Sequence, residues 1–182
     1  QLPPVVYQIP TLIQAQIEVP VILSSNRAEL LNSILTETQV SDRTTQIYPT
    51  ITAGENTYKP APTQSILGVL AFRTSAGFNR SIQEIAFGAT AEKEPFIVLK
   101  AESFDSAFAG MLAWEQSISA DLSPLFGTPV TETFDPQSRT DTQVRSAFFK
   151  DTIASNKNVR LLLDENGEDR LIYTFINQNT IL

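Results

Sequence analysis

Glu115 is the acidic residue whose place in the sequence most suggests a specific role. Apolar residues recur around it at spacings of three, four and seven, which is the period of one face of an α-helix. Glu115 falls near the centre of that stripe, four residues after Met111 and three before Ile118. An unpaired ionised carboxylate on a buried face costs several kcal/mol, so we expect it to be neutralised or to meet backbone amides or an arginine. The stripe consists of Phe104, Phe108, Met111, Ile118, Leu122 and Leu125, and the candidate arginines are Arg73, Arg80 and Arg160.

Paired carboxylates can hydrolyse glycosidic bonds without histidine, and Glu115 with Asp105 or Asp121 would be the candidates here. On a helical wheel, however, both aspartates lie well off the stripe that Glu115 occupies. The chain also has one Trp and four Tyr, which is few for a sugar-binding groove. A buried structural ion pair is therefore the favoured role of Glu115, and it remains a weak candidate catalytic residue.

Four oxygen-bearing side chains crowd into six residues near the C-terminal end of the sequence, and these could hold calcium. The full calcium-loop signature is missing, because no bidentate glutamate follows at the required place. A solvated turn is the favoured interpretation, so we expect no metal, and the weak candidate ligands are Asp164, Asn166, Glu168 and Asp169.

The 182 residues include no cysteine and no histidine. Disulfides, thiol nucleophiles, zinc-thiolate sites and the commonest general base are thereby excluded. Among seven glycines there is no glycine-rich loop to hold a phosphate. The composition thus favours a protein without a cofactor and without enzymatic activity.

The charge and the ends of the sequence bear on its partners and its location. A net charge of −7 argues against nucleic acid, whose phosphates require clustered lysine and arginine. No apolar run reaches the roughly 20 residues that span a bilayer. Because Gln1 is not an initiator methionine, we expect a segment of a longer or processed protein, with any membrane contact made by a part outside this chain.

Residues 95–127 contain a predicted strand, a helix cap and a helix in succession, and these elements would position Glu115. Phe96 to Leu99 suits a strand covered on both faces. Ser103 is placed to cap a long central helix over about 103–122, and Gly110 within it suggests close approach by another backbone. Residues 20–35 repeat the order of proline, apolar strand, cap and helix, with Asn26 as the cap. The two stretches are either related β-α units or alike by chance.

The remaining sequence indicates an α+β domain with a mostly antiparallel sheet and shorter helices on one face. Residues 1–20 contain four prolines and are expected to form an extended arm or linker, followed by one domain over 21–182 with possible sub-lobes 21–90 and 91–182. Residues 41–63 are expected to form a loop or hairpin over the surface, with an exposed strand at 45–51. The other expected elements are a helix at 65–72, a turn at 75–77, a strand over 81–90 that pairs with 96–99, a helix at 144–153, and a hairpin of 159–163 with 171–176.

Four stretches together resemble one protein family. They are PFIVLKAESFDSAFAGMLAWE at 95–115, SADLSPLFG at 119–127, FKDTIASNKNVRLLLDENG at 149–167 and LIYTFINQNTIL at 171–182. They are similar to uncharacterised membrane-anchored surface proteins of Candidate Phyla Radiation (Patescibacteria) bacteria, in which such a domain follows a single N-terminal membrane helix. The resemblance implies an anchored domain facing outside the cell, and a strand at Thr180 that continues past Leu182.

These observations favour a non-enzymatic extracytoplasmic domain of a bacterial surface protein that acts through a protein partner or self-association. Assembly would occur if the arm over 1–20 or the strand from Thr180 added to a neighbour's sheet. The alternative is a carboxylate-based hydrolase acting on cell-envelope polymer, with Glu115 as its catalytic group.

Overall fold

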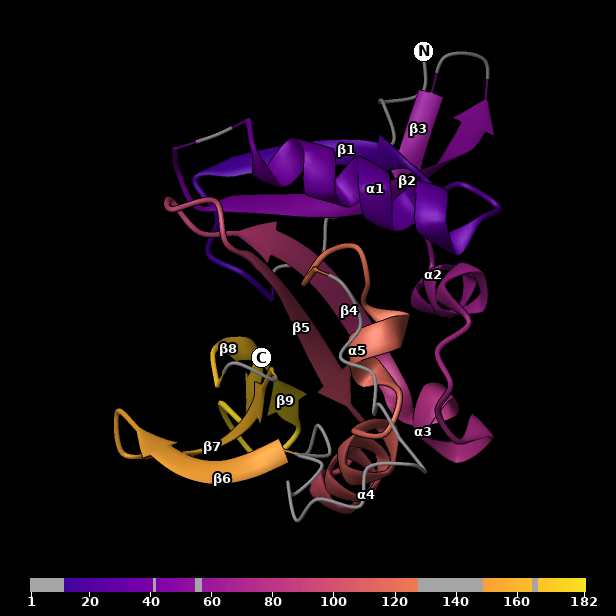
Figure 1. Cartoon of the computed structure of the whole chain (residues 1–182). Helices are drawn as coiled ribbons and strands as arrows, with labels where there is room; N and C mark the ends of the chain where they lie inside the picture. The colour runs from indigo at the N-terminus through magenta and orange to yellow at the C-terminus, as the bar shows by residue number, and fades with distance from the viewer. Residues whose placement is uncertain (1–11, 41, 55–56, 128–148, 165–166) are drawn as a thin grey trace, which may run out of the picture.

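Two β-sheets and five helices make up the part of the protein that the structure describes. The computed structural model describes residues 12–40, 42–54, 57–127, 149–164 and 167–182 (Figure 1). The larger sheet has the strand order β1-β2-β4-β5-β9, with β3 paired to β2. β1 runs parallel to β2, and every other pairing is antiparallel among the described strands. The predicted α+β class with a mostly antiparallel sheet is confirmed. The strands of this sheet are β1 (Ile17–Ile22), β2 (Thr45–Gly54), β3 (Thr57–Pro60), β4 (Ile82–Ala89), β5 (Pro95–Ala101) and β9 (Thr180–Ile181).

The second sheet is an antiparallel meander in the order β6-β7-β8. Its last two strands form the hairpin predicted for this part of the chain, with Leu162 opposite Leu171. The helix predicted over 144–153 is wrong from Phe149 onward, and residues 144–148 lie outside the described part of the chain. Ser155 and Asn156 adopt φ values of 50° and 61°, the left-handed conformation that tight hairpin turns require, so this segment turns back as a strand. The strands are β6 (Phe149–Ala154), β7 (Lys157–Leu163) and β8 (Asp169–Thr174).

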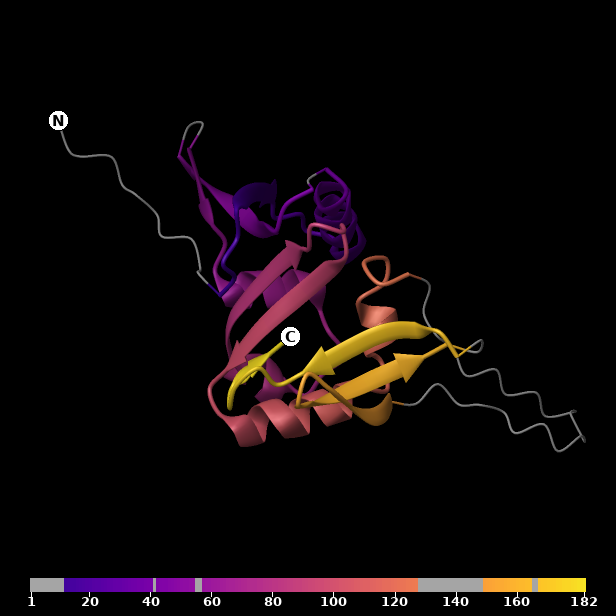
Figure 2. The same cartoon turned by 90° about the vertical axis from the view of Figure 1, so that its left-hand side faces the viewer.

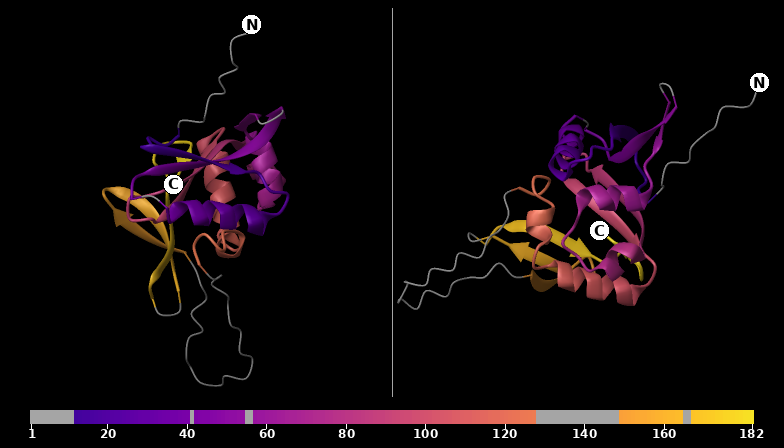
Figure 3. Two further views of the ribbon diagram at one scale, coloured as in Figure 1. Left: turned by 90° about the horizontal axis from the view of Figure 1, so that it is seen from above. Right: turned by 90° about the vertical axis from the view of Figure 1, so that its right-hand side faces the viewer.

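The β4–β5 hairpin separates two of the helices from the second sheet. Figure 1 shows α2 and α3 to one side of this hairpin and the second sheet to the other, and the views in Figures 2 and 3 agree. α4 and α5 lie near the end where the second sheet meets the first. The helices are α1 (Arg27–Thr38), α2 (Thr63–Leu70), α3 (Ala76–Ser81), α4 (Phe104–Trp114) and α5 (Ile118–Asp121).

Both predicted strand-cap-helix units are present. The side chain of Asn26 accepts from the backbone N–H of Ala28 (2.8 Å) and caps α1, and Ser103 accepts from Ser106 (3.4 Å) to cap α4. Their surroundings differ, because α1 leads back to β2 beside β1, whereas α4 leads away toward the second sheet. The turn expected at 75–77 is the start of α3, which Ser75 caps.

The strand expected to be exposed at 45–51 is mostly buried, so that prediction was wrong. β2 pairs with β1 on one edge and with β4 and β3 on the other. Its polar residues suggested exposure, but their hydroxyl groups form hydrogen bonds inside the protein. The hydroxyl of Thr50 donates to the carbonyl of Val21 (3.0 Å), and that of Thr45 donates to the carbonyl of Arg43 (2.9 Å). Residues 17–20 belong to β1, so the expected boundary at residue 20 falls inside a strand.

The long helix expected over 103–122 is divided into α4 and α5, which corrects the prediction. The backbone turns at Glu115, Gln116 and Ser117. The indole N–H of Trp114 donates to Asp121 (2.7 Å), seven residues further on. This hydrogen bond spans the break and joins the last residue of α4 to the last residue of α5.

The buried side of α4 also differs from the expected stripe. Phe104 and Phe108 are 45% and 44% exposed, whereas Gly110, Met111 and Trp114 are buried. The ring of Phe78 on α3 occupies the space where a Cβ on Gly110 would lie. Gly110 thus permits close approach, but by an aromatic ring and not by a backbone.

β9 joins the two sheets. Ile181 pairs with Leu99 of β5 on one side. On the other side, Leu182 exchanges two backbone hydrogen bonds with Thr174 (2.8 and 2.9 Å), and the N–H of Ile176 donates to the carbonyl of Thr180 (2.9 Å). In the described part of the chain this segment is therefore hydrogen-bonded along both edges, and not open for addition to a neighbour.

Asp121 is the polar centre of the helical layer. Its side chain has no exposed surface. Besides the indole of Trp114, it accepts from the backbone N–H of Arg73 (2.7 Å) and from Arg73 Nε (2.7 Å), and Arg27 Nη1 approaches to 3.4 Å. One carboxylate thereby connects the start of α1, the loop after α2, the end of α4 and α5.

Replacing Asp121 with alanine is expected to destabilise the protein by at least about 2 kcal/mol, because the buried indole N–H of Trp114 loses its partner. Arg27→Gln is the control: Arg27 is 38% exposed and lies at the longer distance, so its loss is expected to cost less than about 1 kcal/mol. Urea unfolding monitored by circular dichroism measures both changes. Equal effects of the two substitutions would contradict the central role of Asp121.

Candidate functional site

Glu115 lies at the end of α4 and reaches across to the second sheet. Arg160 on β7 holds it with two parallel hydrogen bonds, from Nε to Oε1 (2.7 Å) and from Nη2 to Oε2 (2.6 Å). The phenol of Tyr173 on β8 donates a further hydrogen bond to Oε1 (2.6 Å). The Glu115 side chain is 15% exposed and that of Arg160 is 23% exposed. The prediction of a largely buried, arginine-paired carboxylate is confirmed, with Arg160 as the partner among the three candidates.

A second carboxylate shares the same arginine. Asp151 on β6 accepts from Arg160 Nη1 (2.9 Å), but its side chain is 85% exposed. The guanidinium thus lies between two carboxylates, one largely buried and one in solvent. Its planar shape suits this arrangement, because it can present a two-pronged face to Glu115 and still donate to Asp151.

The electrostatics of this cluster keep the Tyr173 phenol and the Arg160 guanidinium protonated. Burial, together with the hydrogen bond to Glu115, raises the pKa of the Tyr173 phenol above its usual value. The hydrogen bond to Glu115 likewise raises the pKa of Arg160. A tyrosine nucleophile needs a lowered pKa, and a general acid or base needs a proton it can exchange easily. Hydrogen bonds hold the side chains of Glu115, Arg160 and Tyr173 in place, and this arrangement is poorly suited to proton transfer.

The other sequence-predicted acids have different surroundings. Asp105 lies in the exposed first turn of α4, and Asp121 is engaged by the donors described above. The carboxylate that shares a cationic partner with Glu115 is Asp151, which the sequence did not single out as a partner. Of the other arginines proposed for Glu115, Arg73 binds Asp121.

Of the candidate calcium ligands, Asp164 is held by hydrogen bonds within the protein. Asp164 accepts from the backbone N–H of Glu168 (3.0 Å) and from Arg170 Nε (3.0 Å). Glu168 and Asp169 are exposed, and Asn166 lies outside the described residues. Among the residues that the structure does describe, no group of three acidic side chains is placed to hold a metal ion.

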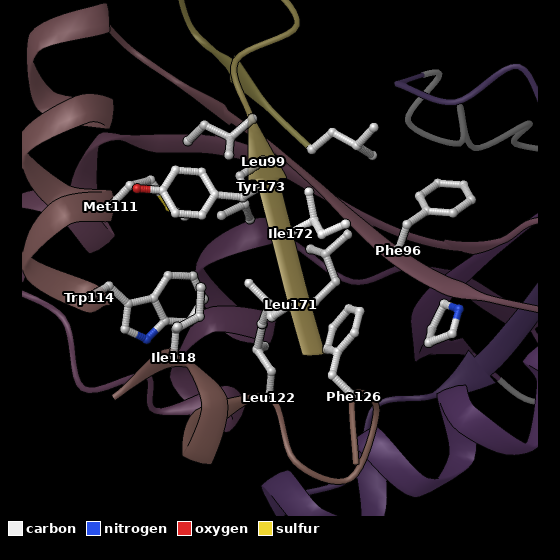
Figure 4. Close-up of a pocket in the computed structure, with 14 residues that line it drawn as sticks. Phe96, Leu99, Met111, Trp114, Ile118, Leu122, Phe126, Leu171, Ile172 and Tyr173 are labelled. Atoms are coloured by element: carbon white, nitrogen blue, oxygen red, sulfur yellow. The ribbon is translucent and has the colours of Figure 1, made fainter. Parts of the chain in front are cut away.

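An apolar pocket lies between the two sheets, close to the Glu115 cluster. Figure 4 shows its walls, which come from β5, α4, α5, the segment after α5 and β8. The pocket holds about 100 Å³. Apart from parts of Tyr173 and Trp114, the described lining residues carry only apolar side chains. The residues labelled in Figure 4 are Phe96, Leu99, Met111, Trp114, Ile118, Leu122, Phe126, Leu171, Ile172 and Tyr173.

The two polar atoms near this pocket are both engaged. The Tyr173 hydroxyl donates to Glu115, and the Trp114 indole donates to Asp121. Tyr173 and Trp114 are thereby each oriented by a carboxylate that does not line the pocket. Ile172 and Leu182 at the rim are 53% and 41% exposed, which leaves the pocket accessible from that side. The arrangement can accept an apolar group, but it offers that group no free donor or acid from these two residues.

The pocket was not predicted from the sequence, because its walls come from segments far apart in the chain. The sequence of β8 held a usable signal: Leu171, Ile172 and Tyr173 are three consecutive apolar residues, so both faces of the strand carry apolar side chains, and Ile172 is the exposed one. An exposed isoleucine in a strand of a predicted hairpin indicates an apolar surface on its outer side.

Comparison of the chain with protein-family models, with curated proteins and with solved structures gives no match. Within residues 12–182, omitting the undescribed segments, no helix is long and apolar enough to cross a membrane. The pocket and the ion-pair cluster beside it are therefore the features that bear on function.

Replacing Glu115 with glutamine is expected to destabilise the protein by about 1.5–3 kcal/mol, because hydrogen bonds to charged groups are worth about that much when they are shielded from water. Asp151→Asn removes the exposed carboxylate from the same arginine and is expected to cost less than about 0.5 kcal/mol. Chemical denaturation at neutral pH measures both. An unchanged free energy of unfolding in Glu115→Gln would contradict a structural role for this ion pair.

Proposed function

We propose that this chain is a non-enzymatic, protein-binding domain on the outer face of a bacterial cell envelope. The observation that supports it best is the apolar pocket between the sheets, whose nearby polar atoms, on Trp114 and Tyr173, are committed to buried carboxylates. Such a pocket favours binding through apolar contact and offers little for catalysis.

The size of the pocket indicates what it binds. A cavity of roughly 150 Å³ with similar walls holds a benzene ring in another protein. At about 100 Å³, this pocket suits a single aliphatic side chain. An acyl chain or a sugar ring would need more room, and a sugar would also need free hydrogen-bond partners. The occupant is therefore a protein segment that inserts one leucine, isoleucine or valine.

The ion-pair cluster supports this function by fixing one wall of the pocket. Tyr173 lines the pocket with its ring while its hydroxyl is held by Glu115 and, through Glu115, by Arg160. A rigid wall reduces the entropy lost on binding. The same pairing weakens the case for a carboxylate hydrolase, because two hydrogen bonds from the Arg160 guanidinium hold the Glu115 side chain in place.

The proposed location depends on the sequence. The resemblance to membrane-anchored surface proteins is carried by residues 95–115, 119–127, 149–167 and 171–182. A chain without cysteine has no thiol to oxidise outside the cell, which is compatible with that location.

Selection of a random phage-displayed peptide library against the full chain tests the binding function. Peptides that share one aliphatic residue at a fixed position are expected to be enriched. Ile172→Asp is expected to weaken their binding at least about tenfold, because it places a charge at the pocket rim. Ile153→Asp is the matched control, since Ile153 is 73% exposed on the same sheet and does not line the pocket. Enrichment of peptides without an aliphatic anchor, or equal losses in both variants, would contradict the proposal.

The location is tested on intact cells that carry the full-length gene. An antibody raised against this domain is expected to label the cells without permeabilisation, since the domain is proposed to face outward. Labelling that requires permeabilised cells would disprove an outward-facing domain and leave the pocket experiment unaffected.

A further inference from the structure

β9 lies between β5 and β8 but pairs with only part of each strand. On β5 the pairing ends at Leu99, and among the described strands none pairs with residues 95–98 on that side. On β8 the pairing ends at Thr174, which exchanges two hydrogen bonds with Leu182, and no described strand pairs with residues 169–173 on that side. Past Leu182, two strand edges therefore lie open on either side of the path that β9 follows.

On β5, Ile97 directs its backbone groups toward this path. The N–H and C=O groups of a strand point to alternate sides in successive residues. The N–H of Ala101 donates to the carbonyl of Asn179 (2.8 Å), on the β9 side. Leu99 and Ile97, two and four residues earlier, direct their groups to the same side. Leu99 is paired there with Ile181, and Ile97 is the next residue whose groups point that way.

On β8, the corresponding residue is Ile172. Thr174 exchanges its hydrogen bonds with Leu182, so the same alternation turns the N–H and C=O of Ile172 toward the β9 side. Ile97 and Ile172 thus offer one donor and one acceptor each, from opposite walls of one space.

The apolar pocket lies between these two open edges (Figure 4). We term the part of it that the two edges border the β5–β8 slot. None of the described residues that line the pocket is charged. The walls of the slot are Pro95, Phe96 and Ile97 of β5 and Leu171, Ile172 and Tyr173 of β8.

We infer that an extended segment of a separate protein enters the β5–β8 slot as a strand and forms hydrogen bonds with both edges. The inference rests on the proposed function, because it specifies how the inserted segment binds. β9 provides the continuity, since it runs antiparallel to β5 and, through the bridge between Phe175 and Ile181, antiparallel to the chain that follows β8. A strand that runs in the direction of β9 beyond Leu182 meets Ile97 on one side and Ile172 on the other.

Alternation also places the side chains of the added strand. In β9, Ile181 is 2% exposed and Leu182 is 41% exposed, so one side chain points into the core and the next points outward. An added strand continues this pattern, and every second residue enters the pocket. Aliphatic residues suit these inward positions, whereas the residues between them face solvent and can be polar.

The backbone groups of the slot select a peptide over other apolar occupants. An acyl chain fills apolar space but would leave the N–H and C=O groups of Ile97 and Ile172 without partners, which is costly away from water. A peptide strand supplies a donor and an acceptor at each residue. A charged residue at an inward position would be unpaired among the apolar walls, so the inserted part of the strand is uncharged.

Calorimetric titration of the full chain with a synthetic peptide tests this mode of binding. The probe is an acetylated and amidated hexapeptide of threonine, leucine, threonine, leucine, threonine and lysine, whose leucines take the inward positions. In β9 the inward Ile181 pairs with β5 and the outward Leu182 bonds with β8, so the leucine amides of the probe face β5 and its threonine amides face β8.

Methylation of the probe's backbone nitrogens separates the two edges. N-methylation of both leucines is expected to raise the dissociation constant at least about tenfold, because the hydrogen bonds to β5 are lost. N-methylation of the second and third threonines is expected to do the same through β8. The control is N-methylation of the terminal lysine, which lies beyond the pocket and should change the constant less than about threefold.

Amide hydrogen exchange measured by NMR locates the same bonds on the protein. Saturation with the probe is expected to slow exchange at Ile97 and at Ile172 at least about tenfold, because both N–H groups become hydrogen-bonded. The amide of Ile153 on β6, which does not line the pocket, is the control and should exchange at an unchanged rate.

Losses from both methylated peptides, together with slowed exchange on both walls, support the inference. Binding that survives both methylations overturns it and leaves the proposed function intact, since the aliphatic side chain alone then accounts for the affinity. Loss from one methylated peptide alone also overturns it, because the strand then adds to a single edge. A probe that does not bind overturns strand addition, whereas the phage selection decides the proposed function separately.

Two further outcomes would assign the slot to a different occupant and overturn a separate partner. One is a probe that binds the 182-residue chain but not the product of the complete gene, because the slot then holds a strand of the protein itself. The other is found by sedimentation equilibrium of the chain without peptide, for which 20.1 kDa is the expected mass. Twice that mass, falling when the probe is added, would place a second copy in the slot.

Discussion

The buried carboxylate of Asp121 is the interaction on which the helical part of the structure depends. A charge without exposed surface is tolerated only if donors surround it, and these donors come from the loop after α2, from α4 and from the start of α1. Each of these segments is therefore fixed relative to α5. The hydrogen bond from Trp114 to Asp121 spans the break between α4 and α5 and fixes the two helices relative to each other.

Glu115, at the start of that break, fixes the other half of the molecule. Its pairing with Arg160 and Tyr173 attaches the second sheet to the end of α4. Glu115 and Asp121 are six residues apart, and they bind different parts of the molecule. Asp121 binds the helical segments, and Glu115 binds the second sheet. The apolar pocket lies where these two attachments meet, and its walls are held from outside by polar bonds.

The sequence predicted what depends on local chemistry and missed what depends on distant residues. The β4–β5 and β7–β8 hairpins and the caps at Asn26 and Ser103 were correctly predicted, since periodicity and local hydrogen bonding determine them. The inward position of Glu115 followed from the helical period, whereas its partner Arg160, 45 residues away, could be named only as one of three candidates. The exposed side of α4 was placed wrongly, because its aromatic residues fit the same helical period as its small buried ones. The buried position of Asp121 was missed because its donors are up to 94 residues away. The pocket was missed for the same reason.

The position of β9 between the two sheets has a consequence for the rate of folding. Leu99 and Ile181 are 82 residues apart in the chain (181 minus 99), whereas the β4–β5 and β6–β7 hairpins close over short turns. Long-range pairings are slow to form because the entropy of closing a large loop is lost before the contacts compensate it. The hairpins are therefore expected to form early and the joining of the sheets late. Until then the future pocket walls remain open to solvent, and a partly folded chain is most prone to aggregate at this stage.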